Sequence, residues 1–111
     1  MIDLEKMADA HKRLFPNATA ESQFYKMEEE IQEFEEAIRK RDGGQCVKEH
    51  ADIIIVCGGL YRWFPKTAKA IYDYYGCHKL IEKEVNRKWQ INLKRKWEWN
   101  GKTYHHVGDE E

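Results

Sequence analysis

The stretch KMEEEIQEFEEAIRK, residues 26–40, is the most informative part of the sequence, because its apolar and acidic side chains recur with the period of a helix. At about 100° per residue, apolar positions spaced three and four residues apart share one side of a helix. They predict the core face of a helix over residues 19–42, formed by Phe24, Met27, Ile31, Phe34 and Ile38. The same run holds six glutamates between Glu28 and Glu36, and their directions decide their role.

These glutamates divide into two groups. Four are predicted to lie on the solvated surface, the last two of them four residues before basic partners: Glu28, Glu29, Glu35 and Glu36. A second column borders the apolar stripe and consists of Lys26, Glu30, Glu33 and Ala37. We therefore expect Glu30 and Glu33 to face sideways toward a neighbouring helix.

Turn signals divide the chain into helix-length segments. Pro16, the Gly43-Gly44 stop and Pro65 separate four predicted helices, over residues 2–14, 19–42, 45–63 and 67–97. We expect Asn17 or Thr19 to cap the second and Thr67 the fourth, which is expected to break near Gly76. The tail around the Asn100-Gly101 turn predicts a small hairpin or an extended arm. The predicted fold class is all-α, a single domain over residues 1–111 built as a bundle of four to five helices with a short extended C-terminal tail.

Composition excludes several broad classes of protein. A net charge of -1, with 35% charged and 41% hydrophobic residues, is untypical of a disordered chain or of a generally basic nucleic-acid binder. The longest apolar run, IIIVCGGLY at 53–61, is too short to span a bilayer, so no membrane association is expected. Three cysteines without a Cys-x-x-Cys motif indicate reduced thiols and a cytoplasmic protein.

A second pair of acids lies in EHADIIIVCGGLYRWF, residues 49–64. Glu49 and Asp52 are three residues apart and share a face that continues in apolar or small side chains. Carboxylates are costly to desolvate without partners, and a divalent cation with oxygen ligands is the simplest remedy. The two helices therefore predict a four-carboxylate site for Mg²⁺ or Mn²⁺, formed by Glu30, Glu33, Glu49 and Asp52.

Two other kinds of metal site are disfavoured. A di-iron bundle would show Glu-x-x-His, and no glutamate has a histidine three residues later. Zinc would need a complete ligand set, which the pairs Cys46–His50 and Cys77–His78 do not provide.

Basic residues form a face of the last helical segment. Lys88, Asn92 and Arg95 are spaced four and three residues apart beside the apolar stripe of Ile81, Val85, Trp89 and Leu93. Lysine and arginine suit phosphate oxygens, and arginine can contact two of them at once. Lys26, one turn before Glu30, is a further candidate for phosphate binding, with a salt bridge to Glu30 as the alternative.

Several motifs resemble one protein family. EEIQE at 29–33 followed by EHAD at 49–52 resembles the E-E-x-x-E … E-x-x-D signature of the MazG-like, all-α nucleoside triphosphate pyrophosphohydrolases. KWQINLKRKW at 88–97 resembles their K-x-x-x-N-x-x-R motif. FPNATAESQFYKMEEE and the closing GKTYHHV look like small phage-type members, so the resemblance covers residues 15–107.

The resemblance implies that a nucleoside triphosphate and water give the monophosphate and diphosphate, with Mg²⁺ or Mn²⁺ as cofactor. It implies catalytic and metal-binding roles for Glu30, Glu33, Glu49 and Asp52, and phosphate binding by Lys88, Asn92 and Arg95. The substrate is expected to be a purine deoxynucleotide such as dGTP or dATP. A homodimer or a homotetramer in the form of a dimer of dimers is expected, in the host cytoplasm if the protein is phage-encoded.

Other readings remain open at this level. A non-enzymatic helical binding or regulatory module could use the acidic face, and metal-dependent pyrophosphate release would distinguish an enzyme from it. The basic, tryptophan-rich segment 87–99 is compatible with binding of single-stranded nucleic acid, although no stable nucleic-acid partner is expected.

Aromatic candidates for a base slot are Phe15, Phe24, Trp63, Trp89 and Trp97. Gly58-Gly59 inside a helix predicts a close approach, with helix packing favoured over a ligand, while His105 and His106 are expected at the surface.

Overall fold

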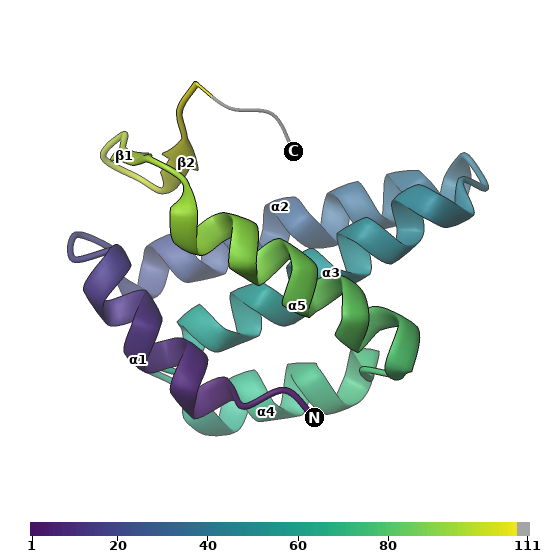
Figure 1. The fold of residues 1–111 in the computed structure, drawn as a ribbon, viewed down its shortest axis with the longest axis horizontal. Coiled ribbons are helices and arrows are strands. Elements are labelled where there is room, and N and C mark those ends of the chain that lie inside the picture. Colours follow the sequence, from purple (N-terminus) through teal and green to yellow (C-terminus); the bar gives the residue numbers. More distant parts are fainter. Residues whose placement is uncertain (109–111) are drawn as a thin grey trace.

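The computed structural model describes residues 1–108 and shows five helices followed by a two-stranded antiparallel hairpin (Figure 1). The elements are α1 Leu4–Leu14, α2 Ala20–Arg39, α3 Gly43–Leu60, α4 Pro65–Tyr75, α5 Lys79–Lys94, β1 Trp97–Trp99 and β2 Tyr104–His106. The predicted all-α class with a short C-terminal tail is confirmed. The fourth predicted helix breaks at Gly76, as expected, and residues 109–111 of the predicted domain lie outside the described residues.

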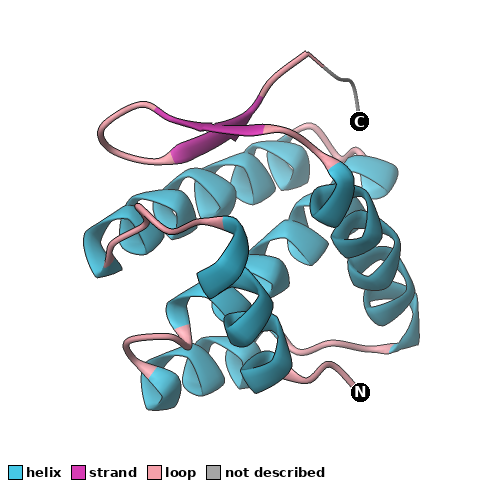
Figure 2. Ribbon diagram, turned by 60° about the vertical axis from the view of Figure 1, so that its left-hand side comes forward, coloured by secondary structure: helices cyan, strands magenta, loops and turns pink. Residues whose placement is uncertain are grey.

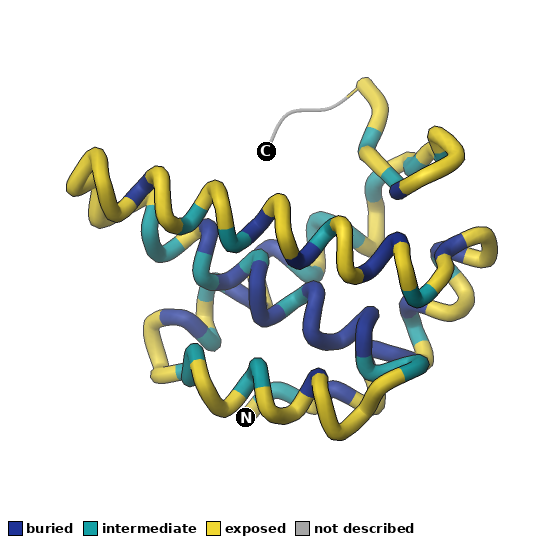
Figure 3. The backbone as a smooth tube through the Cα atoms, turned by 180° about the vertical axis from the view of Figure 1, so that it is seen from behind, coloured by how far each residue is buried: buried dark blue, intermediate teal, exposed yellow. Residues whose placement is uncertain are grey.

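Helix α3 is the centre of the bundle. It packs against each of the other four helices. Ile53, Ile54, Cys57 and Leu60 are fully buried, and α3 is the mostly dark-blue helix through the middle of Figure 3. A polar side chain on α3 therefore lies at a contact between helices, where it needs a partner.

The helix ends follow side-chain chemistry. Thr19 caps α2, because its hydroxyl accepts from the Ser22 backbone N–H at 3.0 Å while Ser22 Oγ accepts from the Thr19 N–H at 2.9 Å. The prediction that α2 ends at Gly43-Gly44 is wrong by a few residues. Both glycines lie in the first turn of α3, and α2 ends earlier, near Arg41, whose φ is 56°. Asp42 begins α3 by accepting from the Gln45 N–H at 3.0 Å.

The fourth predicted helix begins two residues earlier than expected. Pro65 occupies the first helical position, where its missing N–H is not needed. Phe64 is the N-cap residue, and Thr67, the predicted cap, lies inside α4.

The predicted core face of α2 is wrong at both of its ends. Phe24 and Ile38 are 41% and 52% exposed, whereas Met27 is buried as expected. The other buried positions include Glu30 and Ala37, which belong to the neighbouring column. The buried side is thus rotated by roughly a quarter of a turn from the apolar stripe, because α3 packs against the column that contains Glu30.

Helix α5 shows the same displacement. Ile81 and Val85 are buried as predicted, but further along the helix Lys88 is buried while Leu93 is 37% exposed. The basic face therefore points into the bundle in the second half of α5.

The hairpin lies outside the bundle, beyond the C-terminal end of α5 (Figure 2). Trp97 pairs with His106 and Trp99 with Tyr104. In the turn, the Asn100 side chain accepts from the backbone N–H groups of Lys102 and Thr103, at 2.9 and 2.8 Å. The hairpin contacts the loop before α2 through a hydrogen bond, in which the Asn17 N–H donates to the Tyr104 hydroxyl at 3.0 Å.

Within residues 1–108, no helix combines the length and the apolarity needed to cross a membrane.

Candidate active site

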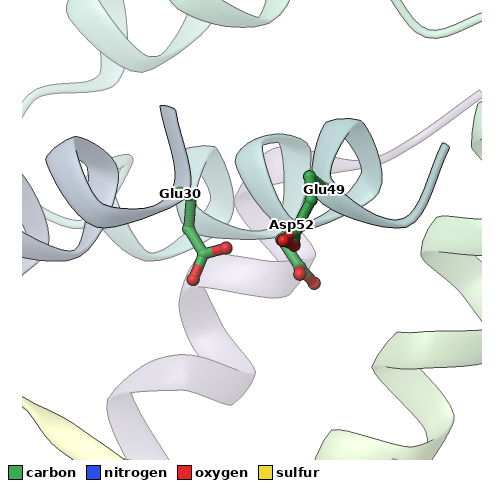
Figure 4. Close-up of side chains that lie close together, drawn as sticks. All are labelled: Glu30, Glu49 and Asp52. Atoms are coloured by element: carbon green, nitrogen blue, oxygen red, sulfur yellow. The ribbon is translucent and has the colours of Figure 1, made fainter. Parts of the chain in front are cut away.

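Three carboxyl groups meet between α2 and α3 (Figure 4). Glu30 comes from α2, and Glu49 and Asp52 come from α3, with one oxygen of each within 4.8 Å of the others. Glu30 and Glu49 are only 8% and 7% exposed. Oε2 of Glu30 is buried and has no hydrogen-bond partner among the described residues. We call these three residues the acidic triad; their donor set consists of oxygen atoms alone, as Mg²⁺ and Mn²⁺ prefer.

The triad is electrostatically strained without a cation. Desolvation, together with repulsion from Asp52 and Glu33, raises the pKa of Glu30 from 4.5 to about 8. Desolvation also raises the pKa of Asp52 to about 6, against the attraction of Lys88 and with a contribution from its hydrogen bond with Glu49. Near neutral pH the triad therefore retains a proton, which a bound cation would displace.

Glu33, the fourth predicted metal ligand, lies apart from the triad. Its side chain is exposed, and it does not belong to the group of oxygens within 4.8 Å. Its charge still acts on Glu30 through space. A ligand or base role for Glu33 stays a prediction.

Lys88 contacts the triad directly. Its Nζ lies 2.8 Å from Oδ1 and 2.9 Å from Oδ2 of Asp52, and the lysine side chain is only 10% exposed. Asp52 thus already contacts a cationic group from α5. The same ammonium is placed to meet a phosphate bound beside Asp52.

The other predicted phosphate-binding residues surround this pair. Asn92 follows Lys88 one turn later on α5, and Arg95, the extended residue directly after the helix, donates to the Asn92 side-chain oxygen at 3.3 Å. Lys26 of α2 lies 3.5 Å from Glu29, so its ion pair is with Glu29 rather than with Glu30.

These residues line one cavity of about 420 Å³. The predicted site residues in its wall are Lys26, Glu30, Asp52, Lys88, Asn92 and Arg95. Glu49 belongs to the triad but does not line the cavity, and Glu33 neither lines the cavity nor belongs to the triad. The structure therefore brings the acids and the basic helix face together around a single space.

Aromatic side chains line the same cavity. Phe15 packs against Trp97 with ring centroids 5.1 Å apart and against Tyr104 at 5.0 Å. Of the predicted aromatic candidates, Phe15, Trp89 and Trp97 line the cavity, whereas Phe24 and Trp63 do not. We call Phe15, Trp97 and Tyr104 the aromatic wall.

Several lining residues were not foreseen from the sequence. His105 is exposed, as expected, and also lines the cavity, whereas His106 is half-buried and its Nδ1 is buried. His11, Ser22 and Gln23 also line it, and no motif marks them. The signal that could have found His11 and Gln23 is Gly59 inside α3, because a side chain there would collide with both of them.

The four glutamates predicted to lie at the surface of α2 are exposed, as expected. Glu36 forms ion pairs with Arg39 at 2.6 Å and with Lys40 at 3.5 Å, although the expected Glu35–Arg39 pair is replaced by the first of these. His50 Nε2 lies 2.8 Å from the Gly76 carbonyl oxygen. In residues 1–108 the acidic triad is the one group of three potential ligands whose atoms meet.

Comparisons with protein-family models, with curated protein sequences and with solved structures find no match to this chain.

Proposed function

We propose that this protein is a metal-dependent nucleoside triphosphate pyrophosphohydrolase, which converts a nucleoside triphosphate and water to the monophosphate and diphosphate. The observation that supports this most is the composition of the cavity beside the acidic triad. Buried carboxyl groups, the inward basic face of α5 and the aromatic wall all border it. A nucleotide bound with its metal needs all three kinds of group: ligands for the metal, cations for the phosphates and a surface for the base.

The acidic triad fits a hard divalent cation. Glu30, Glu49 and Asp52 would hold it, and the unpartnered Oε2 of Glu30 is a buried acceptor that lacks a donor or cation. A bound Mg²⁺ or Mn²⁺ supplies charge stabilisation at the phosphate and lowers the pKa of a coordinated water.

The chain's own residues would perform the remaining tasks. Lys88, Asn92 and Arg95 would bind phosphate oxygens, with Lys26 approaching from α2. The proton of the attacking water would pass to a carboxylate of α2, either Glu30 or the exposed Glu33 beside it. The burial of Lys88 and Glu30 keeps competing water away from the phosphate contacts.

As substrate we propose a purine deoxynucleoside triphosphate, dGTP or dATP, as the resemblance to small phage-type proteins implies. The test is a screen of the eight common ribo- and deoxyribonucleoside triphosphates with Mg²⁺, in which monophosphate and diphosphate products are resolved. Release of monophosphate and pyrophosphate supports the proposal. A protein that hydrolyses none of them, and instead binds a basic partner without metal, would be a helical binding module.

A first prediction concerns the triad. Asp52→Asn and Glu49→Gln each keep the side-chain shape but delete a charged ligand, so pyrophosphate release should fall by orders of magnitude. Without metal, Glu49→Gln should melt no lower than the parent, because one repelling charge is gone. Asp52→Asn also removes the charged partner of the buried Lys88 and should melt lower. Mg²⁺ should stabilise them less than it stabilises the parent, measured as the shift in melting temperature.

Glu35→Gln is the matched control for these variants, since Glu35 is an exposed glutamate on the same helix as Glu30. It should retain activity and the full response to Mg²⁺. If Glu35→Gln abolished activity and Asp52→Asn left it intact, the triad would not be the metal site.

A further inference from the structure

Three side chains form a chain of contacts that reaches the cavity: Arg62, His11 and Gln23. Arg62 Nη1 lies 3.0 Å from His11 Nδ1. A guanidinium group only donates, so Nδ1 is an acceptor and the proton of the neutral ring is on Nε2. Burial and the charge of Arg62 lower the pKa of His11 to about 3, so the ring is neutral near physiological pH.

The next contact fixes the oxygen of Gln23. Gln23 Oε1 and His11 Nε2 lie over the Cα of Gly59, where a Cβ would be 2.7 Å from His11 Nε2 and closer still to Gln23 Oε1. The Gln23 side chain raises the pKa of His11, as an oxygen facing the ring does, against the larger effects of burial and Arg62. Because Nε2 carries the proton, it is the donor and the amide oxygen of Gln23 faces it as the acceptor. Gly59 makes room for this contact.

Ser22 fixes the other end of the amide. Its hydroxyl donates its single proton to the Thr19 carbonyl oxygen at 2.7 Å and accepts from the Thr19 N–H at 2.9 Å. The hydroxyl can therefore only accept from Gln23, whose Nε2 lies 3.4 Å away. An amide that is free to rotate can offer either its oxygen or its nitrogen to a ligand. The amide of Gln23 is held in one orientation from both ends.

This orientation determines what Gln23 offers to the cavity it lines. Its amide nitrogen has two N–H groups, one of which is directed to Ser22, so the second is available to a ligand. A carbonyl oxygen on the ligand would accept from this N–H. An amino group at the same place would meet a donor and leave both groups unpaired in a buried site.

The position of Gln23 suits the base end of a nucleotide. Gln23 and Glu30 are both buried on α2 and are seven residues apart, about 10 Å along the axis. This distance is comparable to the reach of a nucleotide from its phosphorus to the far edge of its base. Phe15, Trp97 and Tyr104 border the same cavity and provide apolar surface for the base.

We propose that Gln23 selects nucleobases that carry a ring carbonyl where adenine and cytosine carry an amino group. Guanine, hypoxanthine, thymine and uracil belong to this class. His11, Arg62 and Ser22 act as positioning residues that hold the donor of Gln23 toward the base. The inference rests on the proposed function in so far as a nucleotide occupies the cavity, and it separates the two purine substrates named above.

The experiment compares substrates that differ at this exocyclic position and in the hydrogen on the adjacent ring nitrogen. The ratio of kcat/KM for dITP over dATP, and for dUTP over dCTP, is measured with Mg²⁺ for the parent protein. The unpaired donor should give a preference of about tenfold or more for the carbonyl-bearing base. Gln23→Glu places an acceptor where the amide nitrogen was, and should abolish or reverse the preference. His11→Phe keeps a planar ring but releases the amide oxygen, so the ratio should move toward one whatever happens to the rate.

Gln32→Glu is the matched control, because Gln32 is an exposed residue of the same helix, and its ratio should equal that of the parent. In parallel, dIMP and dAMP are titrated against metal-free protein by calorimetry. Hydrolysis with a ratio near one in the parent, or an unchanged ratio in Gln23→Glu, overturns the inference while the proposed function stands. No hydrolysis, together with tighter binding of dIMP that Gln23→Glu removes, supports base selection and refutes the proposed function. No hydrolysis with equal or undetectable binding of both monophosphates overturns the inference as well.

Discussion

Glu30 is buried beside two other carboxyl groups, and its ionisation opposes folding. The pKa of this carboxyl is raised from 4.5 to about 8 in the folded protein, with burial as the largest cause. Between these values the folded protein binds more protons than the unfolded chain. The stability that protonated Glu30 contributes is fully present below pH 4.5 and is lost as the pH rises through about 8.

A second prediction follows for the protein in EDTA. The free energy of unfolding, measured with urea, should fall between about pH 7 and 8.5 in the parent. Glu30→Gln cannot ionise, so most of this fall should disappear in that variant. His11 does not interfere, because its pKa is lowered to about 3 and its effect on stability lies below the ordinary histidine value of 6.5. Glu35→Gln should behave like the parent, and an equal fall in Glu30→Gln would contradict the assignment.

Gly59 gives a third prediction at the scale of a single residue. A Cβ at Gly59 would lie 2.7 Å from His11 Nε2, in the middle of a packed helix contact. Gly59→Ala should therefore destabilise the protein by about 1–3 kcal/mol, in spite of the better helix propensity of alanine. Gly44→Ala is the control, since its nearest neighbour would be Asp42 Oδ1 at 3.7 Å. A melting temperature of Gly59→Ala at or above that of the parent would show that His11 and Gln23 can move aside.

At the scale of elements, the helices were largely predictable and their buried faces were not. Caps and breakers such as Thr19, Pro65 and Gly76 act locally, so the sequence reveals them. The apolar stripe of α2 includes Phe24 and Ile38, which are exposed, while the buried side contains Glu30. Hydrophobic periodicity assumes that polar residues avoid the interior, and this assumption fails where carboxyl groups are gathered in a site. The sequence nevertheless identified Glu30 as a site residue, because Glu30 and Glu33 are three residues apart and Glu49 and Asp52 repeat this spacing on the next helix.

The contacts of His11 could not be predicted in the same way. His11 lies on α1, whereas the side chains it contacts come from other elements: Gln23 lies on α2, and Arg62 lies just after the end of α3. Hydrogen bonds between such positions depend on how the helices cross. Gly59 predicted a close approach at this point of α3, but the sequence did not show that His11 and Gln23 are the residues that approach it.

The C-terminal end of α5 leads to a fourth prediction. Arg95 lines the cavity and is expected to make a charge-assisted contact to phosphate, on the order of 1.5–3 kcal/mol. Arg95→Ala should therefore raise KM by about tenfold or more. Lys94→Ala removes an exposed cation from the neighbouring position and should leave KM unchanged. Steady-state kinetics with the preferred substrate would test this, and equal KM values for parent and Arg95→Ala would remove Arg95 from the phosphate site.

At the scale of the whole molecule, one cavity is built from segments distributed along most of the chain. Phe15 follows α1, Gln23 and Glu30 lie on α2, and Asp52 lies on α3. Helix α5 and the hairpin complete the wall. Beside it, the Asn17–Tyr104 hydrogen bond joins the loop before α2 to strand β2. The sequence predicted the acidic and basic parts because each pair of acids, and the run from Lys88 to Arg95, is a short pattern local to one segment. The aromatic wall requires the hairpin to return to α1, which local sequence patterns do not specify.

Apolar surface is also left on the outside of this molecule. Phe24 and Phe64 are 41% and 44% exposed, and their ring centroids are 5.7 Å apart. They come from the start of α2 and from the connection between α3 and α4, so the pair bridges two elements. The neighbouring aromatic residues Trp63, Tyr72 and Tyr75 are half-buried. The exposed pair is therefore a surface that a second copy of the chain could cover.

The fifth prediction is that the protein forms a homodimer or a dimer of dimers and that the Phe24–Phe64 pair contributes to its contact. Paired exposed aromatic rings gain free energy when a second copy covers them, because apolar surface leaves water. Light scattering coupled to gel filtration should give a mass at least twice that of the chain. The double variant Phe24→Ser Phe64→Ser should shift this mass toward the monomer, whereas Leu80→Ser, which removes a 62% exposed side chain at the start of α5, should not. A parent protein that is monomeric at working concentration would refute self-association, and an oligomeric double variant would place the contact elsewhere.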